Sequence, residues 1–522
     1  MHYFQLIKKK KIRSYTYSNI DKLTNNFCKI LLNNRLNKNT VNLKAIIHGS
    51  SSIETSISIL ACSKLGIHFS VIFEDLEIEA IKKRIKLVKP DIFITRFKKK
   101  KFNEKILSKL KNPSKIKFIF FDKLDNRRET LEIENKAFNS NKDFFTLFTS
   151  GSTGLPKGIV HAKGGYMVAT KYTCINQFGM NEKSVILTAS DAAWLNGHTY
   201  ALFGPLSLGA TSILMETPML LLDENLLKKI LKLKVSILYL PVTIIRLMKA
   251  LFRNSKFKTK YLKTLGSMGE HLAPSVASWF AGAFTKKNKC IINAYYQTEN
   301  GAIIASPTYK DTINKIPHGS VGKMSTKYLK TNKISNKLQT EIKLCSPWPG
   351  NMKRILNGKK EWNKYWDKSK FFRMFDLATN KGGNLYIHGR NDDVINIRGH
   401  RIGCEEVESS LLTINSIKEC CAVSLPDKLE GEILYFFVVT KEKIEDQIIK
   451  KITNNFGSFA LPKKIYYIQE LPKTRSGKIL RRLLRNILLN LNSLKKIDLS
   501  VIKNKKIIKD LIKKIKNEKN KS

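Results

Sequence analysis

An apolar, strand-like run, Phe144 to Phe148, opens into Thr149-Ser150-Gly151-Ser152-Thr153-Gly154-Leu155-Pro156-Lys157-Gly158. This loop holds three glycines, four hydroxyl side chains and one lysine within ten residues. Glycine lets the backbone approach a ligand closely, and successive N–H and O–H donors suit the oxygens of a polyphosphate. The pattern predicts a nucleotide-binding loop.

The loop differs from the Walker A sequence, in which four residues separate the first glycine from Gly-Lys-Ser/Thr. After Gly151 and four further residues comes Pro156, and Lys157 is followed by Gly158. Ordinary surface turns also gather glycine, serine, threonine and proline. Taken alone, the loop therefore leaves a surface turn open as the alternative.

Length and composition indicate a globular protein with more than one domain. The chain has 522 residues, 42% of them hydrophobic, and this length exceeds what one hydrophobic core usually serves. The formal charge of +52 would ordinarily suggest a nucleic acid or an anionic membrane as partner. The lysines are spread along the whole chain, however, as in Lys8 to Lys11 and Lys98 to Lys101. Such spread charge indicates a solvated surface, and no specific nucleic-acid site is expected.

The cysteines give no sign of a disulfide framework or a zinc site. Eight are present, without a Cys-x-x-Cys pair or histidines at zinc spacing. The N-terminal segment does not have the order of a signal peptide, and no run of 18 apolar residues follows it. We expect a cytoplasmic protein without a membrane span.

Helical and strand-like patterns alternate through the first part of the chain. Ser18 is expected to cap the first helix. We expect helices at 15–36, 51–65, 77–88, 165–178 and 199–208, and strands at 42–48, 69–73, 92–95, 117–122 and 184–189. This alternation predicts the α/β class, with a large N-terminal domain of layered, mostly parallel sheets covered by helices.

The composition shifts near Asn384, and a smaller α+β unit follows. A turn is expected at 389–393 between two short strands at 385–387 and 394–397. Beyond it we expect strands at 419–424 and 434–440, helices at 405–412 and 445–454, a loop at 471–478, and an amphipathic helix in the tail.

Five further stretches carry polar chemistry, although each is weak alone. A lone aspartate in a loop usually forms a turn, and a tyrosine pair on a strand is usually core. The stretches are Gly266-Ser267-Met268-Gly269-Glu270, Tyr295-Tyr296-Gln297-Thr298-Glu299, Asp376, Gly399-His400-Arg401, and Pro472-Lys473-Thr474-Arg475-Ser476-Gly477-Lys478.

In this order, the stretches closely resemble the AMP-forming acyl-CoA synthetases of the adenylate-forming (ANL) superfamily, and within it the acetyl- and propionyl-CoA synthetases. Trp194, Gly197-His198 and Trp348-Pro349-Gly350 also stand in the family's order. The resemblance runs from about Ile12 to the C-terminus. It implies that ATP and a small carboxylic acid form acyl-AMP and pyrophosphate, after which CoA displaces AMP.

The resemblance also implies roles for single residues. The loop, with Thr149, Ser150, Gly151, Ser152, Thr153, Gly154 and Lys157, would bind the β- and γ-phosphates. Glu299 would be the ligand of a bridging Mg²⁺, and Thr298 would reach the α-phosphate. The adenine slot would be formed by Gly269, Glu270, Asn293, Tyr295, Tyr296 and Gln297. Asp376 would bind the ribose hydroxyls, with Arg390 beside the ribose and Arg401 beside the phosphates.

Lys478 is expected to be the main catalytic residue of the first half-reaction. Its ammonium group would neutralise the carboxylate and the α-phosphate, two anions that must meet. The resemblance implies that a mobile C-terminal domain carries this lysine. We expect a large adenylate-forming domain at 1–389, a hinge at 390–393 centred on Asp392, and a small domain at 394–522.

The acyl pocket is expected around Trp194, Leu195, Met268 and Tyr296. Acetate- and propionate-activating members carry a tryptophan in place of Tyr296 and valines in place of Leu195 and Met268. One change enlarges the pocket and two fill it. Because a methylene is worth only about 1–3 kcal/mol of discrimination, acetate, propionate and other small acids stay open.

Departures from the family pattern concentrate on the CoA side. Glu74 and Asp75 stand where members have two glycines, Arg398 replaces a serine, and Thr453 replaces a basic residue. Met374-Phe375-Asp376 replaces Thr-Gly-Asp. An adenylating ligase with a non-CoA acceptor, such as a carrier-bound thiol, is therefore an alternative, and a basic, non-catalytic binding protein on the same scaffold is another. Lys478, Glu299 and the intact loop argue against the latter.

Overall fold

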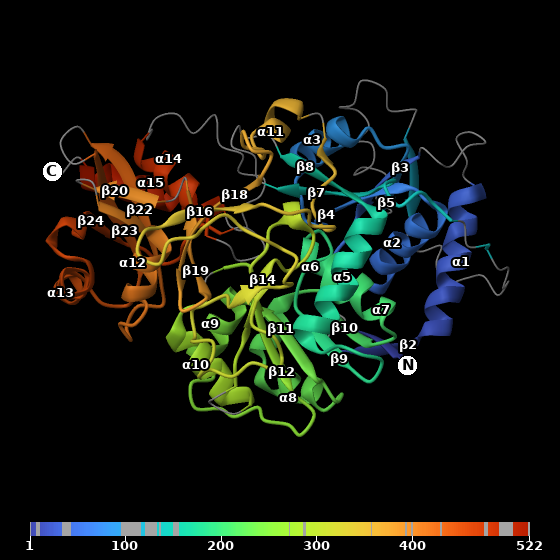
Figure 1. Ribbon diagram of the computed structural model, residues 1–522, viewed down its shortest axis with the longest axis horizontal. Helices are drawn as coiled ribbons and strands as arrows, with labels where there is room; N and C mark the ends of the chain where they lie inside the picture. The colour runs from blue at the N-terminus through green and yellow to red at the C-terminus, as the bar shows by residue number, and fades with distance from the viewer. Residues whose placement is uncertain are drawn as a thin grey trace.

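The computed structural model describes residues 2–6, 11–33, 43–95, 116–120, 133–134, 137–149, 156–270, 272–285, 289–356, 358–391, 394–397, 400–427, 431–473, 479–489 and 505–519. Figure 1 shows a large body, coloured blue to yellow, and a smaller C-terminal domain in orange and red beside it. The chain is mixed α/β with parallel sheets, as the sequence predicts.

The first sheet carries the predicted nucleotide-binding loop. Its inner strands are parallel and nearly continuous in apolar residues, as expected where helices cover both faces. The strand order is β17 (Arg354–Ile355), β8 (Lys157–Ala162), β7 (Asp143–Thr149), β4 (His68–Ile72), β3 (Lys44–His48), β5 (Ile92–Thr95) and β6 (Lys117–Phe120). Only the β7–β8 and β8–β17 pairings in this sheet are antiparallel.

The second sheet lies below the first in Figure 1. Its order is β13 (Ile292–Asn293), β12 (Thr264–Met268), β11 (Ile237–Pro241), β9 (Val185–Thr188), β10 (Thr211–Met215), β1 (His2–Leu6) and β2 (Ile12–Thr16). All of its pairings are parallel except β1–β2. The carboxyl ends of parallel strands are where ligands bind in sheets of this kind.

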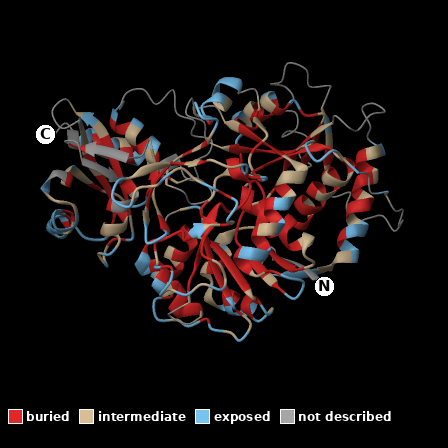
Figure 2. Ribbon diagram, in the orientation of Figure 1, coloured by how far each residue is buried: buried red, intermediate tan, exposed pale blue. Residues whose placement is uncertain are grey.

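Helices cover and separate the two sheets. They are α1 (Tyr17–Asn33), α2 (Ile53–Leu65), α3 (Ile78–Val88), α5 (Lys163–Phe178), α6 (Leu195–His198), a π-helical turn (Thr199–Phe203), α7 (Gly204–Ser207), α8 (Glu224–Leu231), α9 (Val242–Leu251), α10 (Pro274–Phe284) and α11 (Lys359–Asn363), with 3₁₀ turns at Pro218–Leu222 and Thr298–Asn300. One apolar cluster joins α1, α2 and α5 to strands of both sheets. Figure 2 shows these strands as continuous buried ribbon.

The start of α1 differs from the prediction. The helix begins at Tyr17, so Ser18 lies inside its first turn. Thr16 is the cap: its hydroxyl accepts from the Asn19 N–H at 3.1 Å, and the Asn19 side chain accepts from the Thr16 N–H at 3.0 Å. This reciprocal pair is a capping box with asparagine in the position usually held by Glu or Gln. Because Thr16 and Ser18 are both good capping residues and lie only two positions apart, the sequence did not distinguish between them.

A third, antiparallel sheet links the large body to the C-terminal domain. It contains β16 (Thr340–Leu344), β18 (Phe372–Lys381) and β19 (Asn384–Arg390), and a short ribbon of β14 (Ala305–Ser306) and β15 (Lys323–Met324) lies near it. The turn expected at 389–393 is wrong for its first two residues, because Gly389 and Arg390 still pair with β18. Residues 392 and 393 lie outside the described residues.

The C-terminal domain packs a sheet between two pairs of helices. Its elements are β20 (Val394–Ile397), β21 (His400–Gly403), α12 (Cys404–Leu411), β22 (Glu419–Asp427), β23 (Gly431–Val439), α13 (Glu445–Phe456), a 3₁₀ turn (Ser458–Ala460), β24 (Pro462–Tyr467), α14 (Arg481–Leu489) and α15 (Lys505–Lys519). Separate apolar clusters lie under α12 with α13 and under α14 with α15. No helix in the described ranges is long and apolar enough to cross a bilayer.

Phe375 adopts a backbone conformation that suits glycine. Its φ is +56°, in the left-handed region, although the residue is aromatic and lies within β18. Its ring packs edge-on against Tyr365 with centroids 5.3 Å apart, and the Arg373 guanidinium lies 4.7 Å from its centroid. A phenylalanine therefore occupies a glycine-like bend, and its ring contacts Tyr365 and Arg373.

This strain gives a direct prediction. Because an L-residue costs roughly 1–2 kcal/mol in the left-handed region, Phe375→Gly should be more stable than Phe375→Ala by about 1 kcal/mol. At Phe372, on the same strand without a positive φ, the order should reverse, since glycine weakens ordinary strand positions. Urea denaturation of the four variants measures both differences. The same order at both positions would contradict the prediction.

Candidate active site

The predicted phosphate-binding loop closes the hairpin of β7 and β8. Thr149 ends β7 and pairs with Lys157, which begins β8. Ser150, Gly151, Ser152, Thr153 and Gly154 lie outside the described residues. The pairing of Thr149 with Lys157 therefore fixes the two ends of the loop next to each other.

At the Lys157 end, three side chains form one hydrogen-bonded chain. The Lys157 Nζ donates to the Tyr365 hydroxyl at 2.8 Å, and this hydroxyl donates to Glu299 Oε1 at 2.6 Å. The Nζ lies 3.9 Å from the same Oε1, and both charged side chains are more than four-fifths buried. Burial and the Glu299 carboxylate raise the pKa of Tyr365, so the phenol stays protonated and can donate.

The backbone around Glu299 is held from three sides. Trp348 Nε1 donates to the Asn300 carbonyl at 2.8 Å, and His161 Nε2 contacts the Thr298 carbonyl at 2.7 Å. Gly301 has φ +72°, and a Cβ there would lie 2.5 Å from the Gly350 carbonyl oxygen. Burial lowers the pKa of His161 to about 4, so the ring is neutral at pH 7 and can hold this carbonyl without adding charge. The Thr298–Asn300 turn is thus fixed by the Trp348-Pro349-Gly350 run.

A second group of predicted residues gathers around Asp376. Its Oδ2 accepts from the Tyr295 hydroxyl at 2.8 Å and from Gln297 Nε2 at 2.5 Å, and the Arg390 Nη1 lies 3.6 Å from its Oδ1. Among the described residues, no hydrogen-bond partner reaches the buried Gln297 Oε1. Gly269, at φ +88°, has open space where a Cβ would stand. A buried free acceptor and open space beside a glycine are features that fit a nucleoside.

The Asn293 side chain makes hydrogen bonds to other parts of the protein. Its Nδ2 donates to the Ser320 carbonyl at 3.1 Å, and its Oδ1 accepts from the Ser267 hydroxyl at 3.2 Å. The side chain joins β12 to β13 and to the loop before β15. It therefore supports the position of Tyr295 and Tyr296, which follow it in the chain.

Of the four predicted acyl-pocket residues, Leu195 and Met268 belong to apolar clusters against which Tyr296 packs. Leu195 and Met268 are buried, and the Trp194 ring packs edge-on against Phe73 with centroids 5.3 Å apart. Asn196, which the sequence analysis missed, joins the other two: its Nδ2 contacts the Met268 sulfur and its Oδ1 accepts from the Tyr296 hydroxyl. The signal for Asn196 was its place between Leu195 and Gly197, inside a stretch already singled out.

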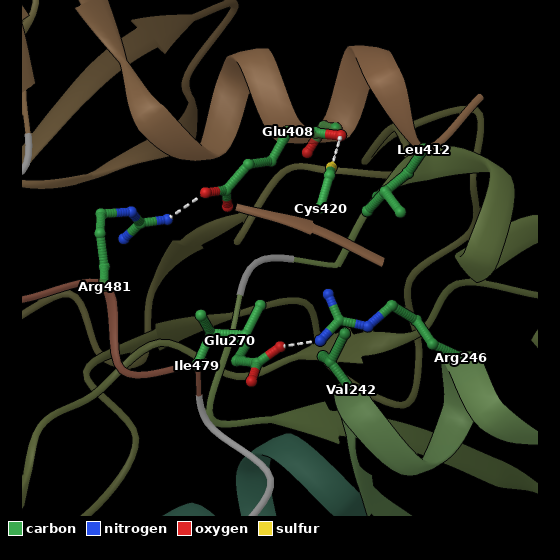
Figure 3. Close-up of a pocket in the computed structure, with 10 residues that line it drawn as sticks. Val242, Arg246, Glu270, Glu408, Leu412, Cys420, Ile479 and Arg481 are labelled. Carbon is green, nitrogen blue, oxygen red and sulfur yellow. Dashed lines mark hydrogen bonds and ion pairs between the residues drawn. The ribbon is translucent and has the colours of Figure 1, made fainter. Parts of the chain in front are cut away.

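Glu270 faces the C-terminal domain. Its carboxylate accepts from the Thr243 hydroxyl at 3.0 Å and pairs with Arg246 on α9. Figure 3 shows this pair opposite Glu408 and Arg481 of the C-terminal domain. A cavity of about 60 Å³ separates the two sides, and Ile479 also lines it. The residue that follows Lys478 thus lies on the same cavity as Glu270.

Three predicted residues cannot be placed through their side chains. Asp392 and Lys478 lie outside the described residues. Arg401 lies on β21, where only its backbone is described. Lys473 and Ile479, which flank the lysine loop, form a β-bridge that closes its base.

The donor set near the loop fits a phosphate-bound Mg²⁺ ion. Among the described residues, no group of three or more His, Cys, Asp or Glu side chains gathers into a metal centre. Mg²⁺ is commonly held by one or two carboxylates together with substrate phosphates. Glu299 supplies one such carboxylate beside the loop.

Comparisons with known proteins identify the family of the chain. The family model "AMP-binding enzyme" matches residues 3–330, and "AMP-binding enzyme C-terminal domain" matches residues 406–478. Acetyl-coenzyme A synthetase 2 of Debaryomyces hansenii is 31% identical over 486 residues, covering 83% of this chain and 71% of the relative. Acetyl-coenzyme A synthetase of Marinobacter nauticus is 29% identical over 521 residues, covering 92% and 80%.

Solved structures share the fold at lower identity. An anthranilate CoA ligase in complex with anthranoyl-AMP superposes with a TM-score of 0.78 at 22% identity, covering 91% of this chain and 92% of its own. The o-succinylbenzoate CoA synthetase of Bacillus subtilis gives 0.78 at 18% identity, covering 93% and 95%. With the two family models and the acetyl-coenzyme A synthetase relatives, this fold shows that the chain belongs to the AMP-binding enzyme family, as an AMP-forming acid–CoA ligase of the ANL superfamily.

Proposed function

We propose that the protein activates a small acid such as acetate or propionate with ATP and then transfers the acyl group to CoA. The observation that carries this proposal is the chain Lys157–Tyr365–Glu299, fixed at the mouth of the glycine-rich loop. It brings a cation, a phenol donor and a carboxylate to the place where the polyphosphate of ATP would lie. Charge that develops on phosphate oxygens is stabilised there by groups already in position.

The phosphate end of ATP is assigned to the loop. Thr149, Ser150, Gly151, Ser152, Thr153, Gly154 and Lys157 would donate to the β- and γ-phosphates. Glu299 would hold Mg²⁺, which supplies positive charge to the phosphates when bound. The Tyr365 hydroxyl donates to one oxygen of this carboxylate, and the other oxygen would be left to hold the metal.

The nucleoside end is assigned to the group around Asp376. Asp376 would accept from the ribose hydroxyls, with Arg390 beside it, and Gln297, Gly269 and Glu270 would line the adenine slot. Tyr295 is held by Asp376 through its hydroxyl and offers its ring, while Asn293 supports the strand beneath. The departure from the family's Thr-Gly-Asp leaves this arrangement intact, because Phe375 retains the glycine-like φ.

In the first half-reaction an oxygen of the substrate carboxylate forms a bond to the α-phosphorus, and pyrophosphate leaves with the electron pair of the broken P–O bond. Lys478 would neutralise the two anions that meet, and Thr298 and Arg401 would contact the phosphate. In the second half-reaction the CoA thiolate bonds to the acyl carbonyl carbon, and AMP leaves. Lys478 and the nucleoside group lie in different domains, so we place a hinge at 390–393, centred on Asp392, between domains at 1–389 and 394–522.

The acyl pocket supports a small substrate. Leu195 and Met268 fill space, while Tyr296 turns its hydroxyl to Asn196 instead of leaving room for a longer chain. The hydroxyl of Tyr239 donates to that of Tyr296 at 3.4 Å. Within the described part of the chain, the Trp194 Nε1 is buried without a hydrogen-bond partner. The eight free cysteines support a reducing compartment, and we propose the cytoplasm.

The similarity to acetyl-coenzyme A synthetases supports CoA, and not a carrier-bound thiol, as the acceptor of the acyl group. Glu74 and Asp75, which motivated the alternative, form a turn between β4 and α3. Thr453 lies on the exposed side of α13, where its carbonyl accepts from the Gly457 N–H at 2.9 Å. Arg398 lies outside the described residues.

Tyr365→Phe should slow adenylation about tenfold or more at saturating ATP. The change leaves the buried Glu299 oxygen without its donor, and an unpaired buried group of this kind costs about 1–3 kcal/mol. Acid-dependent exchange of labelled pyrophosphate into ATP measures the effect. Tyr172→Phe is the matched control, since that hydroxyl reaches only the Ser325 carbonyl at 3.4 Å. Equal rates for both variants would refute a role for the bridge.

The proposed function is tested by AMP release from a panel of formate, acetate, propionate and butyrate, each with and without CoA. We expect release with acetate or propionate that requires CoA for multiple turnovers. Acid-dependent pyrophosphate exchange without CoA-stimulated AMP release would point to another acceptor. An absence of exchange with every acid would overturn the proposal as a whole.

A further inference from the structure

We propose that Arg246 is a positioning residue for acid activation, which sets where the stem of the lysine loop, Lys473 and Ile479 to Arg481, docks on the large domain. The inference rests on the proposed function. It starts from the two sides of this stem, each of which is anchored by a carboxylate of the C-terminal domain, Glu419 or Glu408. Glu408 lines the same cavity as Arg246.

The first end of the loop is anchored at Lys473. Its Nζ pairs with Glu419 Oε1, and both side chains are more than four-fifths buried. Glu419 is the first residue of β22. The β-bridge between Lys473 and Ile479, together with a Leu480 N–H to Pro472 carbonyl bond of 2.9 Å, closes the base of the loop.

The second end is anchored at Arg481, the first residue of α14. Its Nη2 lies 2.6 Å from Glu408 Oε1, and its Nε donates to the Ala422 carbonyl at 3.0 Å. The same Glu408 oxygen accepts from the Ala422 N–H at 2.7 Å. Glu408 thus also supports the fold of its own domain, whereas Glu419 sits at a strand end.

Arg246 and Glu408 line one cavity from opposite sides of the domain boundary. Figure 3 shows the Arg246 guanidinium on α9, on the cavity that Glu408, Cys420 and Arg481 line from the other side. Burial disfavours its charge, but Glu270, Glu419 and Glu408 outweigh that effect and raise the pKa of Arg246. The only carboxylate on its own domain among these three is Glu270.

The charges alternate across the boundary. Arg246 pairs with Glu270 on one side of the cavity, and Glu408 lines its other side, where it also holds Arg481 of the loop stem. Removing the Arg246 charge would leave the Glu270 and Glu408 carboxylates lining one partly desolvated cavity without this cation. Like charges there favour separation of the domains, and a small displacement of the loop is costly, since a shift of 1 Å can reduce a rate about 10²-fold.

A narrower explanation is that Arg246 only neutralises Glu270 and so acts on nucleotide binding. The two explanations differ in what they change. If Arg246 acts on nucleotide binding, its replacement should raise the KM for ATP and leave the rate at saturating ATP unchanged. If Arg246 positions the stem of the lysine loop, its replacement should lower the rate of adenylation at saturating ATP. Thioester formation from supplied acyl-AMP should be unchanged, because Lys478 is assigned to the first half-reaction only.

The test compares Arg246→Gln, Arg246→Lys and the control Lys228→Gln, which removes an exposed cation paired with Glu224 on α8. Acid-dependent pyrophosphate exchange should fall about 10- to 100-fold in Arg246→Gln at saturating ATP, with partial rescue in Arg246→Lys and no change in the control. Thioester formation from acyl-AMP should keep its wild-type rate. A rise in KM alone, or equal loss in both half-reactions, would overturn the inference.

A double-mutant cycle with Glu419 provides an independent test. If Arg246 acts through the loop anchor, Arg246→Gln combined with Glu419→Gln should lose much less exchange activity than the two single losses multiplied. Simple multiplication of the losses would contradict the coupling. Absence of exchange in the wild type would instead count against the proposed function, so the two failures are distinguishable.

Discussion

A buried carboxylate and a buried ammonium group share one phenol hydroxyl at the centre of the site. Glu299 and Lys157 come from segments far apart in the chain, and Tyr365 joins them. Each charge is held by a partner before any ligand arrives, which limits the cost of burying it. The loop of β7 and β8 can therefore end in a fixed cation, and the turn at Thr298–Asn300 can present a fixed carboxylate. We expect binding of a triphosphate with its metal to depend on this arrangement.

The rest of the large domain supports that chain. Neutral His161, Trp348 and the close approach of Gly301 to Gly350 lock the backbone that carries Glu299. Across the site, Asp376 draws Tyr295 and Gln297 toward the nucleoside position. The C-terminal domain then meets the large one at a boundary where the Arg246–Glu270 and Arg481–Glu408 pairs line opposite sides of one cavity. Rigid nucleotide contacts in one domain and a polar boundary to the other suit an enzyme that uses one nucleotide site for two successive steps.

Much of this could be predicted from the sequence, because the motifs are local. The α/β alternation and the glycine-rich loop depend on neighbours in the chain, whereas the acyl pocket of Trp194, Leu195, Met268 and Tyr296 was predicted from the family resemblance. Tyr365, Asn196 and Arg246 were missed since their partners are 66, 72 and 24 residues away, and no spacing rule connects them. Phe375 shows a different limit: the sequence gives an aromatic residue at this position, and only the structure shows that its backbone has a glycine-like φ. The prediction that Ser18 caps the first helix was wrong for a local reason, because Thr16 makes the capping hydrogen bonds instead.

The central claim is that the large domain holds the nucleotide while Lys478 drives acid activation. The most direct measurement compares wild type with Lys478→Ala in two assays, acid-dependent exchange of labelled pyrophosphate into ATP and thioester formation from supplied acyl-AMP and CoA. The account predicts that the variant loses exchange by about 10²-fold or more and keeps thioester formation near the wild-type rate. Equal loss in both assays would contradict it.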